Sequence, residues 1–170
     1  MDAADEQRFR EFVAVRSPAL MRLGYLLTGG DQHAAEDLVQ SALAKLAAKW
    51  RRVDAPEAYT RQIMYRQQIS WWRASGRRGE VVQASPPELA GRDLNHQREL
   101  RMVLRSALAR LTPRQRTVVV LRYFEDLPEQ EVAQALGCSV GTVRSTAHRS
   151  LARLREIAPE LAEELLEVAR

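Results

Sequence analysis

The sequence predicts an all-α protein with two small helical domains joined by a flexible linker, the second domain containing a helix-turn-helix. Apolar residues recur at helical intervals through most of the 170 residues, and no segment alternates apolar and polar residues as strands do. A chain of this length can form two compact helical units. Residues 79–97 contain Ser85-Pro86-Pro87 and little apolar content, which is typical of a linker. The expected units are residues 1–78, this linker, residues 98–158, and an acidic tail over residues 159–170.

Basic residues are concentrated in two zones of the chain. Residues 51–78 hold seven arginines against two acidic residues, and residues 110–155 hold eight arginines against four acidic residues. Residues 156–170 hold five glutamates and one arginine. Two basic zones favour a protein that touches a polyanion at two places, although a solvated Arg-rich helical surface has the same composition.

Several classes of protein are not expected from this composition. The single cysteine, Cys138, cannot form an internal disulfide, and His33, His96 and His148 show no metal-ligand spacing, so neither a metal nor a cofactor is expected. No cluster of carboxylates, His or Cys suggests a nucleophile, so we expect no catalytic residues, no enzyme and no small-molecule substrate. The sequence has no apolar run of about 20 residues and no leader pattern. The expectation is therefore a cytoplasmic protein without a membrane segment.

The first domain is expected to hold three helices. Apolar residues follow helical spacing from Phe9 to Leu27, with Ser17-Pro18 predicting a break or restart. A turn at residues 28–31 precedes a second helix with one apolar face. That face is formed by Val39, Ala42, Leu43, Leu46 and Trp50.

The third expected helix, residues 56–78, separates into apolar rows and a cationic stripe at about 100° per residue. The apolar rows, expected to pack into the domain, are Ala58, Met64, Tyr65, Ile69, Trp71 and Trp72. The stripe consists of Tyr59, Gln62, Arg66, Ser70, Arg73 and Arg77. Guanidinium groups that pair with phosphates beside an aromatic ring that stacks on a base suit a nucleic-acid strand. An Arg-rich solvent face with Tyr59 at the edge of the core is equally compatible with the stripe.

The second domain begins with an apolar helical stripe from Leu100 to Leu111. The next helix has a clear start, because Thr112-Pro113-Arg114-Gln115 provides a capping residue, a first-position proline and a glutamine three residues after the cap. This helix is expected to run toward Phe124. Residues 127–154 then predict helix, tight turn, helix.

The helix-turn-helix prediction rests on small or apolar residues where the two helices must approach. They are Ala133, Gly137 and Val143, and Ser139 is placed to cap the second helix. Cys138 in the turn is interpreted as a packing residue. The outward side of the second helix carries Arg144, Ser145, His148 and Arg149, which suits a major-groove reader. We favour DNA reading over an ordinary helical hairpin with a basic face, because the packing positions and the cationic face occur together.

Both halves of the chain resemble one family. Residues 34–40, Ala34-Ala35-Glu36-Asp37-Leu38-Val39-Gln40, followed by Trp50 and Ala55-Pro56-Glu57-Ala58-Tyr59, look like the core-binding and promoter-opening region of the extracytoplasmic-function sigma factors of bacterial RNA polymerase, within the sigma-70 family. Residues 108–154, including Gly141-Thr142-Val143-Arg144, resemble the promoter-reading domain of the same family. The resemblance covers nearly all of residues 9–155 in the correct order.

The resemblance implies a sigma factor that binds core RNA polymerase and promoter DNA, with an anti-sigma factor as a further candidate partner. The implied polymerase contacts are Glu36, Asp37, Leu38 and Gln40. The implied minus-10 contacts are Arg52, Tyr59, Gln62, Arg66, Ser70, Arg73 and Arg77. The implied minus-35 contacts are Ser139, Val140, Thr142, Arg144, Ser145, His148 and Arg149. The helix over residues 113–124 would face the polymerase flap.

The chain departs from the family pattern in its third helix. The family usually has Asn where Arg66 stands, Asp where Ser70 stands, Trp near Tyr59 and Arg near Gln62, so no minus-10 base preference is carried over. Two other classes of protein fit the sequence less well. A response-regulator transcription factor would need a strand-helix receiver in the first half, which here is predicted helical. A small nucleic-acid enzyme would need a metal or nucleophile cluster.

The acidic end of the chain has two interpretations. Residues 160–170 form a short helix that packs on or screens the basic second domain, or they form a solvated helical end.

Overall fold

The computed structural model describes residues 2–76 and 95–168, and the regular elements in these ranges are all helical. The first domain contains α1 (Ala3–Leu27), α2 (Gln32–Ala47), the short 3₁₀ turn η1 (Trp50–Arg52) and α3 (Pro56–Gly76). The second contains α4 (Asn95–Ala109), α5 (Pro113–Val119), the π-helical turn η2 (Val120–Phe124), α6 (Glu129–Leu136), α7 (Val140–Ile157) and α8 (Pro159–Val168). The all-α prediction is confirmed for the described ranges. The predicted linker lies outside the described residues except for its last three, which belong to α4.

The helix α1 runs without interruption through Pro18, so the predicted break at Ser17-Pro18 is wrong. Proline removes one intrahelical hydrogen bond, the one to the carbonyl of Ala14. Ala14 and Pro18 are both exposed, so water can solvate the freed carbonyl. The Ser17 hydroxyl donates to the Val13 carbonyl at 2.6 Å and occupies another acceptor of the same turn.

The first-domain core lies where α1, α2 and α3 meet. Leu20, Leu23 and Leu27 of α1 are buried together with the apolar face of α2. Gly24 permits the close approach of these two helices, because a Cβ there would lie 3.3 Å from both the Ala35 carbonyl oxygen and a Val39 methyl group. The apolar residues that the sequence predicts on one side of α1 and of α2 therefore form a helix–helix contact.

The helix starts of the second domain follow the local sequence signals. Thr112 and Gln115 form the expected capping box at the start of α5. Gly137 ends α6 in the left-handed region, with φ of 64°, where glycine carries little strain. Ser139 caps α7 by accepting the amide of Thr142 at 3.1 Å. These signals confirm the predicted helix-turn-helix as α6 and α7.

The helix α8 packs against α7 through its apolar side. Ala162 is fully buried and Leu165 is nearly so, and both belong to the hydrophobic core. The glutamates Glu160, Glu163 and Glu164 are exposed. Of the two interpretations of the acidic end, the packed helix is confirmed over the part that the structure describes.

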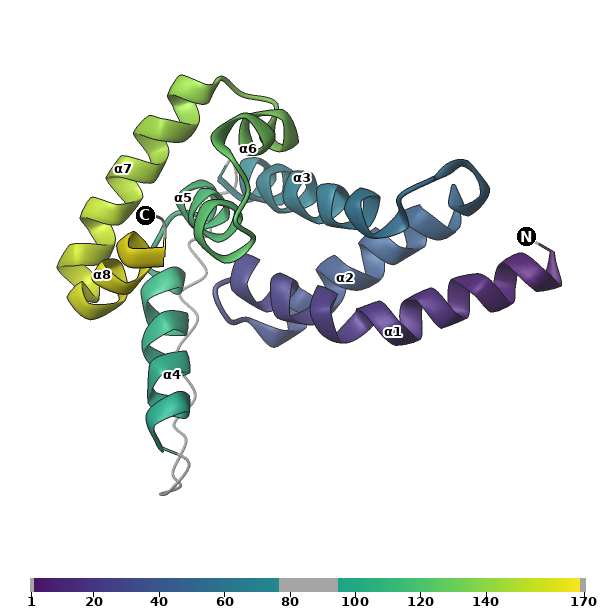
Figure 1. The fold of residues 1–170 in the computed structure, drawn as a ribbon, viewed down its shortest axis with the longest axis horizontal. Coiled ribbons are helices and arrows are strands. Elements are labelled where there is room, and N and C mark those ends of the chain that lie inside the picture. Colours follow the sequence, from purple (N-terminus) through teal and green to yellow (C-terminus); the bar gives the residue numbers. More distant parts are fainter. Residues whose placement is uncertain (1, 77–94, 169–170) are drawn as a thin grey trace.

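The two domains pack against each other through α3, which lies between α2 on one side and α5 and α6 on the other (Figure 1). Buried residues from both halves form one hydrophobic cluster. The glycine turn after α1 also touches the second domain, since a Cβ on Gly29 would meet the guanidinium of Arg116 at 2.9 Å. The helix α3 therefore contacts both its own domain and the second domain.

Candidate nucleic-acid interface

The helix α7 separates a packing face from a cationic face. Val143, Ala147, Leu151 and Leu154 are buried, while Arg144, Ser145, His148 and Arg149 are exposed. This division agrees with the helical spacing in the sequence. It places guanidinium, hydroxyl and imidazole groups on a surface that can enter a major groove.

At the start of α7, some of the predicted minus-35 contacts take part in the N-cap of the helix itself. The Ser139 hydroxyl contacts both the amide and the hydroxyl of Thr142, the hydroxyl pair at 2.8 Å. Val140 is half-buried and packs against the core. Among the predicted minus-35 contacts, these three residues therefore shape the start of the helix, while Arg144, Ser145, His148 and Arg149 present free surface.

Arg144 is held by a carboxylate that sequence reasoning missed. Its Nε donates to Glu129 Oε2 at 2.6 Å, and Glu129 is the first residue of α6. Arg149 Nε instead donates to the carbonyl of Ser145 in its own helix at 3.2 Å. The Glu129 partner lies 15 residues before Arg144, outside the range of helical periodicity, so no local pattern indicates it.

The predicted minus-10 stripe of α3 faces the second domain. Tyr59 and Gln62 are half-buried, whereas Arg66 and Ser70 are exposed. Arg66 Nε donates to the carbonyl of Ala135 in α6 at 3.4 Å. Arg77 and the side chain of Arg73 lie outside the described residues.

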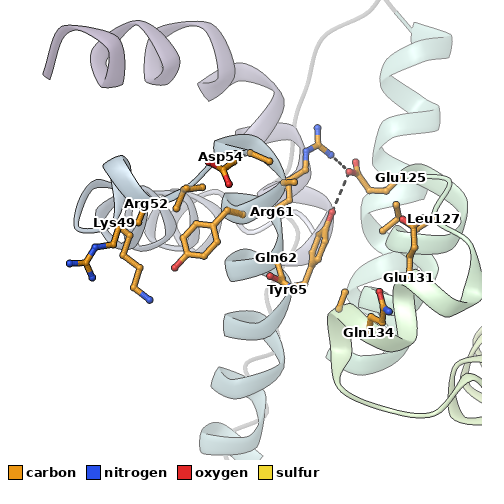
Figure 2. Close-up of a pocket in the computed structure, with 15 residues that line it drawn as sticks. Lys49, Arg52, Asp54, Arg61, Gln62, Tyr65, Glu125, Leu127, Glu131 and Gln134 are labelled. Atoms are coloured by element: carbon orange, nitrogen blue, oxygen red, sulfur yellow. Dashed lines mark hydrogen bonds and ion pairs between the residues drawn. The ribbon is translucent and has the colours of Figure 1, made fainter. Parts of the chain in front are cut away.

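An open cleft of about 1110 Å³ separates the stripe from α6 (Figure 2). Basic groups of the first domain, Lys49 and Arg52, stand at one wall, and Glu125 and Glu131 of the second domain stand at the other. Tyr59 and Gln62 also line it. The cleft therefore joins a cationic wall to an acidic one.

An ion pair closes one side of this cleft, as Figure 2 shows. Arg61 pairs with Glu125, and the Tyr65 hydroxyl donates to the same carboxylate at 3.4 Å. Burial raises the pKa of Tyr65 although Arg61 acts in the opposite direction, so the phenol keeps its proton as a donor. Sequence reasoning placed Tyr65 in the core, which is confirmed, but missed the interdomain contact made by its hydroxyl.

Trp71 is 39% exposed, so the prediction that it packs into the core is wrong. It lies two turns beyond the buried Met64 on the same row of α3. The elements that cover Met64 do not extend over Trp71, since a helix rises about 10 Å over two turns. The side chain of Trp72 lies outside the described residues.

The α2 residues predicted to contact polymerase divide into surface and core. Asp37 and Gln40 are exposed, and Glu36 is half-buried beside Gln32, whose amide donates to it at 3.1 Å. Leu38 is fully buried, so its predicted role as a polymerase contact is wrong. It lies on the same buried face as Ala35 and packs inside the first domain.

Of the two exposed arginines in the basic loop before α3, Arg51 forms ion pairs and Arg52 lines the cleft. Arg51 pairs with Asp2 and Asp5 at the start of α1. Hydrogen bonds from Arg51 and Arg8 hold the pKa of Asp5 below its ordinary value. Arg52 is exposed and lines the cleft, as a DNA contact would require.

Within the described ranges no group of three or more His, Cys, Asp or Glu side chains could hold a metal ion. No described helix is both long enough and apolar enough to cross a membrane.

A helix-turn-helix with an exposed cationic face on a two-domain helical fold is typical of DNA-binding transcription proteins. A family model for sigma-70 region 2 matches residues 13–78, and one for sigma-70 region 4 matches residues 101–154. The chain belongs to the sigma-70 family of RNA polymerase sigma factors, in its extracytoplasmic-function group. It therefore serves promoter-specific transcription initiation, and its partners are core RNA polymerase and promoter DNA. Sigma factors are not enzymes in the usual sense.

Individual relatives agree with this assignment. The RNA polymerase sigma-E factor of Streptomyces coelicolor is 42% identical over 151 residues, covering 87% of this chain and 84% of the relative. The ECF RNA polymerase sigma factor SigE of Mycolicibacterium smegmatis is 31% identical over 163 residues, covering 91% of this chain and 63% of the relative. The sigma factor RpoE of Bartonella quintana, solved in complex with the anti-sigma factor NepR, superposes with a TM-score of 0.60 at 26% identity, covering 96% of this chain and 99% of that one.

Proposed function

We propose that this sigma factor divides its work among three helices: α2 docks on core RNA polymerase, α3 opens and contacts the minus-10 element, and α7 reads the minus-35 element. The observation that carries the proposal is the separation on α7 of a fully buried apolar face from an exposed face with Arg144, His148 and Arg149. Helices that only pack do not need this cationic face.

The surface of α2 supports polymerase docking. Asp37 and Gln40 are exposed on the helix side opposite Leu38 and Ala42, which are fully buried. A carboxylate and an amide on a rigid helix suit a basic and polar partner surface. The charge of the carboxylate guides association more than it adds affinity. Leu38 contributes by holding α2 in place.

The α3 surface supports a strand-binding role that requires domain separation. Arg66, Gln62 and Tyr59 offer a cation, an amide and a ring, but they face α6 across the cleft. A DNA strand can lie along this stripe only after the second domain moves away from it. We therefore propose that binding to core polymerase and promoter is accompanied by separation of α3 from α5 and α6.

The same interdomain contacts suggest how a partner protein could inhibit this sigma factor. A protein that stabilised the packed arrangement would keep the α3 stripe facing the second domain, which makes an anti-sigma factor a candidate partner, as NepR is for RpoE. Because polymerase and promoter DNA are cytoplasmic in bacteria, we propose the cytoplasm as the site of action.

Run-off transcription tests the proposed function. Core RNA polymerase from Streptomyces coelicolor, the source of a relative 42% identical, is incubated with genomic fragments in the presence or absence of the full chain. Discrete transcripts that depend on the chain are the expected result, and the absence of any such transcript would contradict it.

The α2 assignment is tested in the same system with Asp37→Lys, compared with Glu163→Lys on α8 as a charge-matched control. Charge reversal at the docking face is expected to weaken core binding about tenfold or more, because like charges placed at an interface are costly. Unchanged core affinity of Asp37→Lys would remove α2 from the docking surface.

A further inference from the structure

We infer that Glu129 is a positioning residue that aims Arg144 at a base and thereby sets discrimination at the minus-35 element. The inference rests on the proposed function of α7. It adds a specificity determinant from α6, the first helix of the helix-turn-helix, to the contacts expected from α7 itself.

The geometry leaves the useful end of Arg144 free. Glu129 Oε2 accepts a hydrogen bond from Arg144 Nε at 2.6 Å, and the Arg144 side chain remains 68% exposed. A guanidinium is a planar fork of donors, and recognition of guanine O6 and N7 uses two of them side by side. A carboxylate bound at Nε restricts rotation of the fork while its terminal nitrogens stay available. The arginine is therefore presented in a limited set of orientations.

The carboxylate is itself held in place. Glu129 is the first residue of α6, where the helix N-terminus stabilises a negative charge. Its side chain is 29% exposed, less than half the exposure of Arg144. The tight turn fixes α6 against α7, because Gly137 ends one helix and Ser139 caps the next. The ion pair therefore joins two elements that keep a constant relative position.

The Glu129 carboxylate should have opposite effects on general DNA affinity and on base discrimination. A carboxylate beside a DNA-binding face repels phosphates, so removal of its charge should tighten binding to all sequences. Removal of the acceptor should at the same time release Arg144 and reduce its preference for one base. A merely structural role would instead weaken binding to every sequence. Discrimination and general affinity should therefore move in opposite directions.

Two substitutions separate charge from positioning. Glu129→Ala removes both the charge and the acceptor, whereas Glu129→Gln removes the charge but keeps an amide oxygen that can accept from Arg144 Nε. Both variants should bind mismatched sites at least as tightly as the wild type. Glu163→Ala, at an exposed glutamate of α8 that belongs neither to the helix-turn-helix nor to the lining of the cleft, is the matched control.

The experiment uses full-length chain with core RNA polymerase. A pool of promoters randomised at minus-35 first identifies the preferred sequence, and the ratio of Kd values for a mismatched and the preferred sequence is then measured for each variant. Glu129→Ala should lower this ratio about threefold to tenfold, Glu129→Gln should lower it less, and Glu163→Ala should leave it unchanged. In an Arg144→Ala background, Glu129→Ala should have no further effect on the ratio.

Distinct results separate failure of the inference from failure of the proposed function. If Arg144→Ala abolishes discrimination and Glu129→Ala does not alter it, Arg144 reads the base unaided and the inference is wrong. If Glu129→Ala weakens all sites equally, Glu129 is only structural and the inference is also wrong. If Arg144→Ala itself leaves the ratio unchanged, base reading by this residue is wrong and the inference fails with it.

Discussion

Arg116 is a buried cation that connects the ends of two helices in different domains. Its guanidinium donates to the carbonyls of Leu108 at 2.8 Å, Leu111 at 3.2 Å and Leu27 at 3.3 Å. Leu27 is the last residue of α1, and a cation is favourable at a helix C-terminus. Burial lowers the pKa of Arg116 to about 10, so it remains charged at neutral pH. The hydrogen bonds offset the unfavourable desolvation.

Loss of this guanidinium should destabilise the protein substantially. Arg116→Ala leaves three carbonyl groups without their charged donor and creates a cavity, and we expect the free energy of unfolding to fall by about 2–4 kcal/mol. Urea unfolding followed by far-UV circular dichroism measures the change. Arg110→Ala, at an exposed position, should alter it by less than about 0.5 kcal/mol. A loss below about 1 kcal/mol for Arg116→Ala would show that desolvation and hydrogen bonding nearly cancel.

The start of α1 is attached to the basic loop by acidic residues. Asp2 caps the helix by accepting the amide of Asp5 at 2.9 Å, and both carboxylates pair with Arg51. Asp5 also pairs with Arg8 one turn later. The ion pairs hold a long, largely exposed helix end against η1. They also explain why Arg51 contributes to structure while its neighbour Arg52 remains available.

The pairing at Asp5 predicts a pH dependence. Because Arg51 and Arg8 lower its pKa in the folded state, the unfolded chain takes up the proton first as the pH falls. The stabilisation is complete above the ordinary aspartate value of 3.8 and is lost as the pH falls through the lower pKa of the folded state. The Tm difference between wild type and Asp5→Asn should therefore be present at pH 7 and shrink below about pH 4. A difference that stays constant down to pH 2.5 would contradict it.

The helix α8 stabilises the recognition helix from behind. Ala162 and Leu165 are buried where α8 packs on α7, whereas Arg144, Ser145, His148 and Arg149 of α7 remain exposed. Its apolar row, and not its glutamates, makes the contact. The helix therefore has a packing role whether or not its charge affects DNA binding.

Truncation of the buried leucine should reveal that role. Leu165→Ala is expected to lower the free energy of unfolding by about 2–3 kcal/mol through lost burial and the cavity left behind. Glu164→Ala, an adjacent exposed change on the same helix, should have little effect. Equal stability of the two variants in urea unfolding would mean that α8 is a solvated end.

The packing of the two domains against each other is the largest-scale feature of the molecule. The Arg61–Glu125 pair, the Tyr65 hydroxyl and the Arg66 contact with Ala135 all cross the same interface. Both partners of the ion pair are mostly buried, with side chains 25% and 17% exposed. The interface therefore depends on charge complementarity as well as on the shared apolar core.

Charge reversal at Glu125 should separate the domains in the free protein. Glu125→Lys places two cations together in a half-buried site, and we expect it to weaken domain packing by about 1–3 kcal/mol. Small-angle X-ray scattering should show a larger radius of gyration than in wild type, and Arg61→Glu in the same chain should restore the compact value by re-forming the pair in reverse. An unchanged radius of gyration in Glu125→Lys would show that the apolar contacts alone hold the domains.

The sequence alone determined the helices, the helix-turn-helix, the family and the cationic face of α7. Those features depend on signals that act within a few residues, such as the capping box at Thr112, the turn at Gly137 and the cap at Ser139. Helical periodicity then places Arg144 and Arg149 outward, because neighbours along one helix decide which side is apolar. The family resemblance, in contrast, included Leu38 among the polymerase contacts, although its side chain is fully buried.

Only the tertiary structure decided which surfaces meet. Glu129, Glu125 and Leu27, which Arg144, Arg61 and Arg116 respectively contact, lie 15, 64 and 89 residues away from them in the chain, and no local pattern connects such positions. The exposure of Trp71 likewise depends on how far the neighbouring elements extend along α3. Long-range contacts form when complete helix faces pack against one another. The relative placement of these faces depends on the whole chain, whereas residue spacing acts only within one helix.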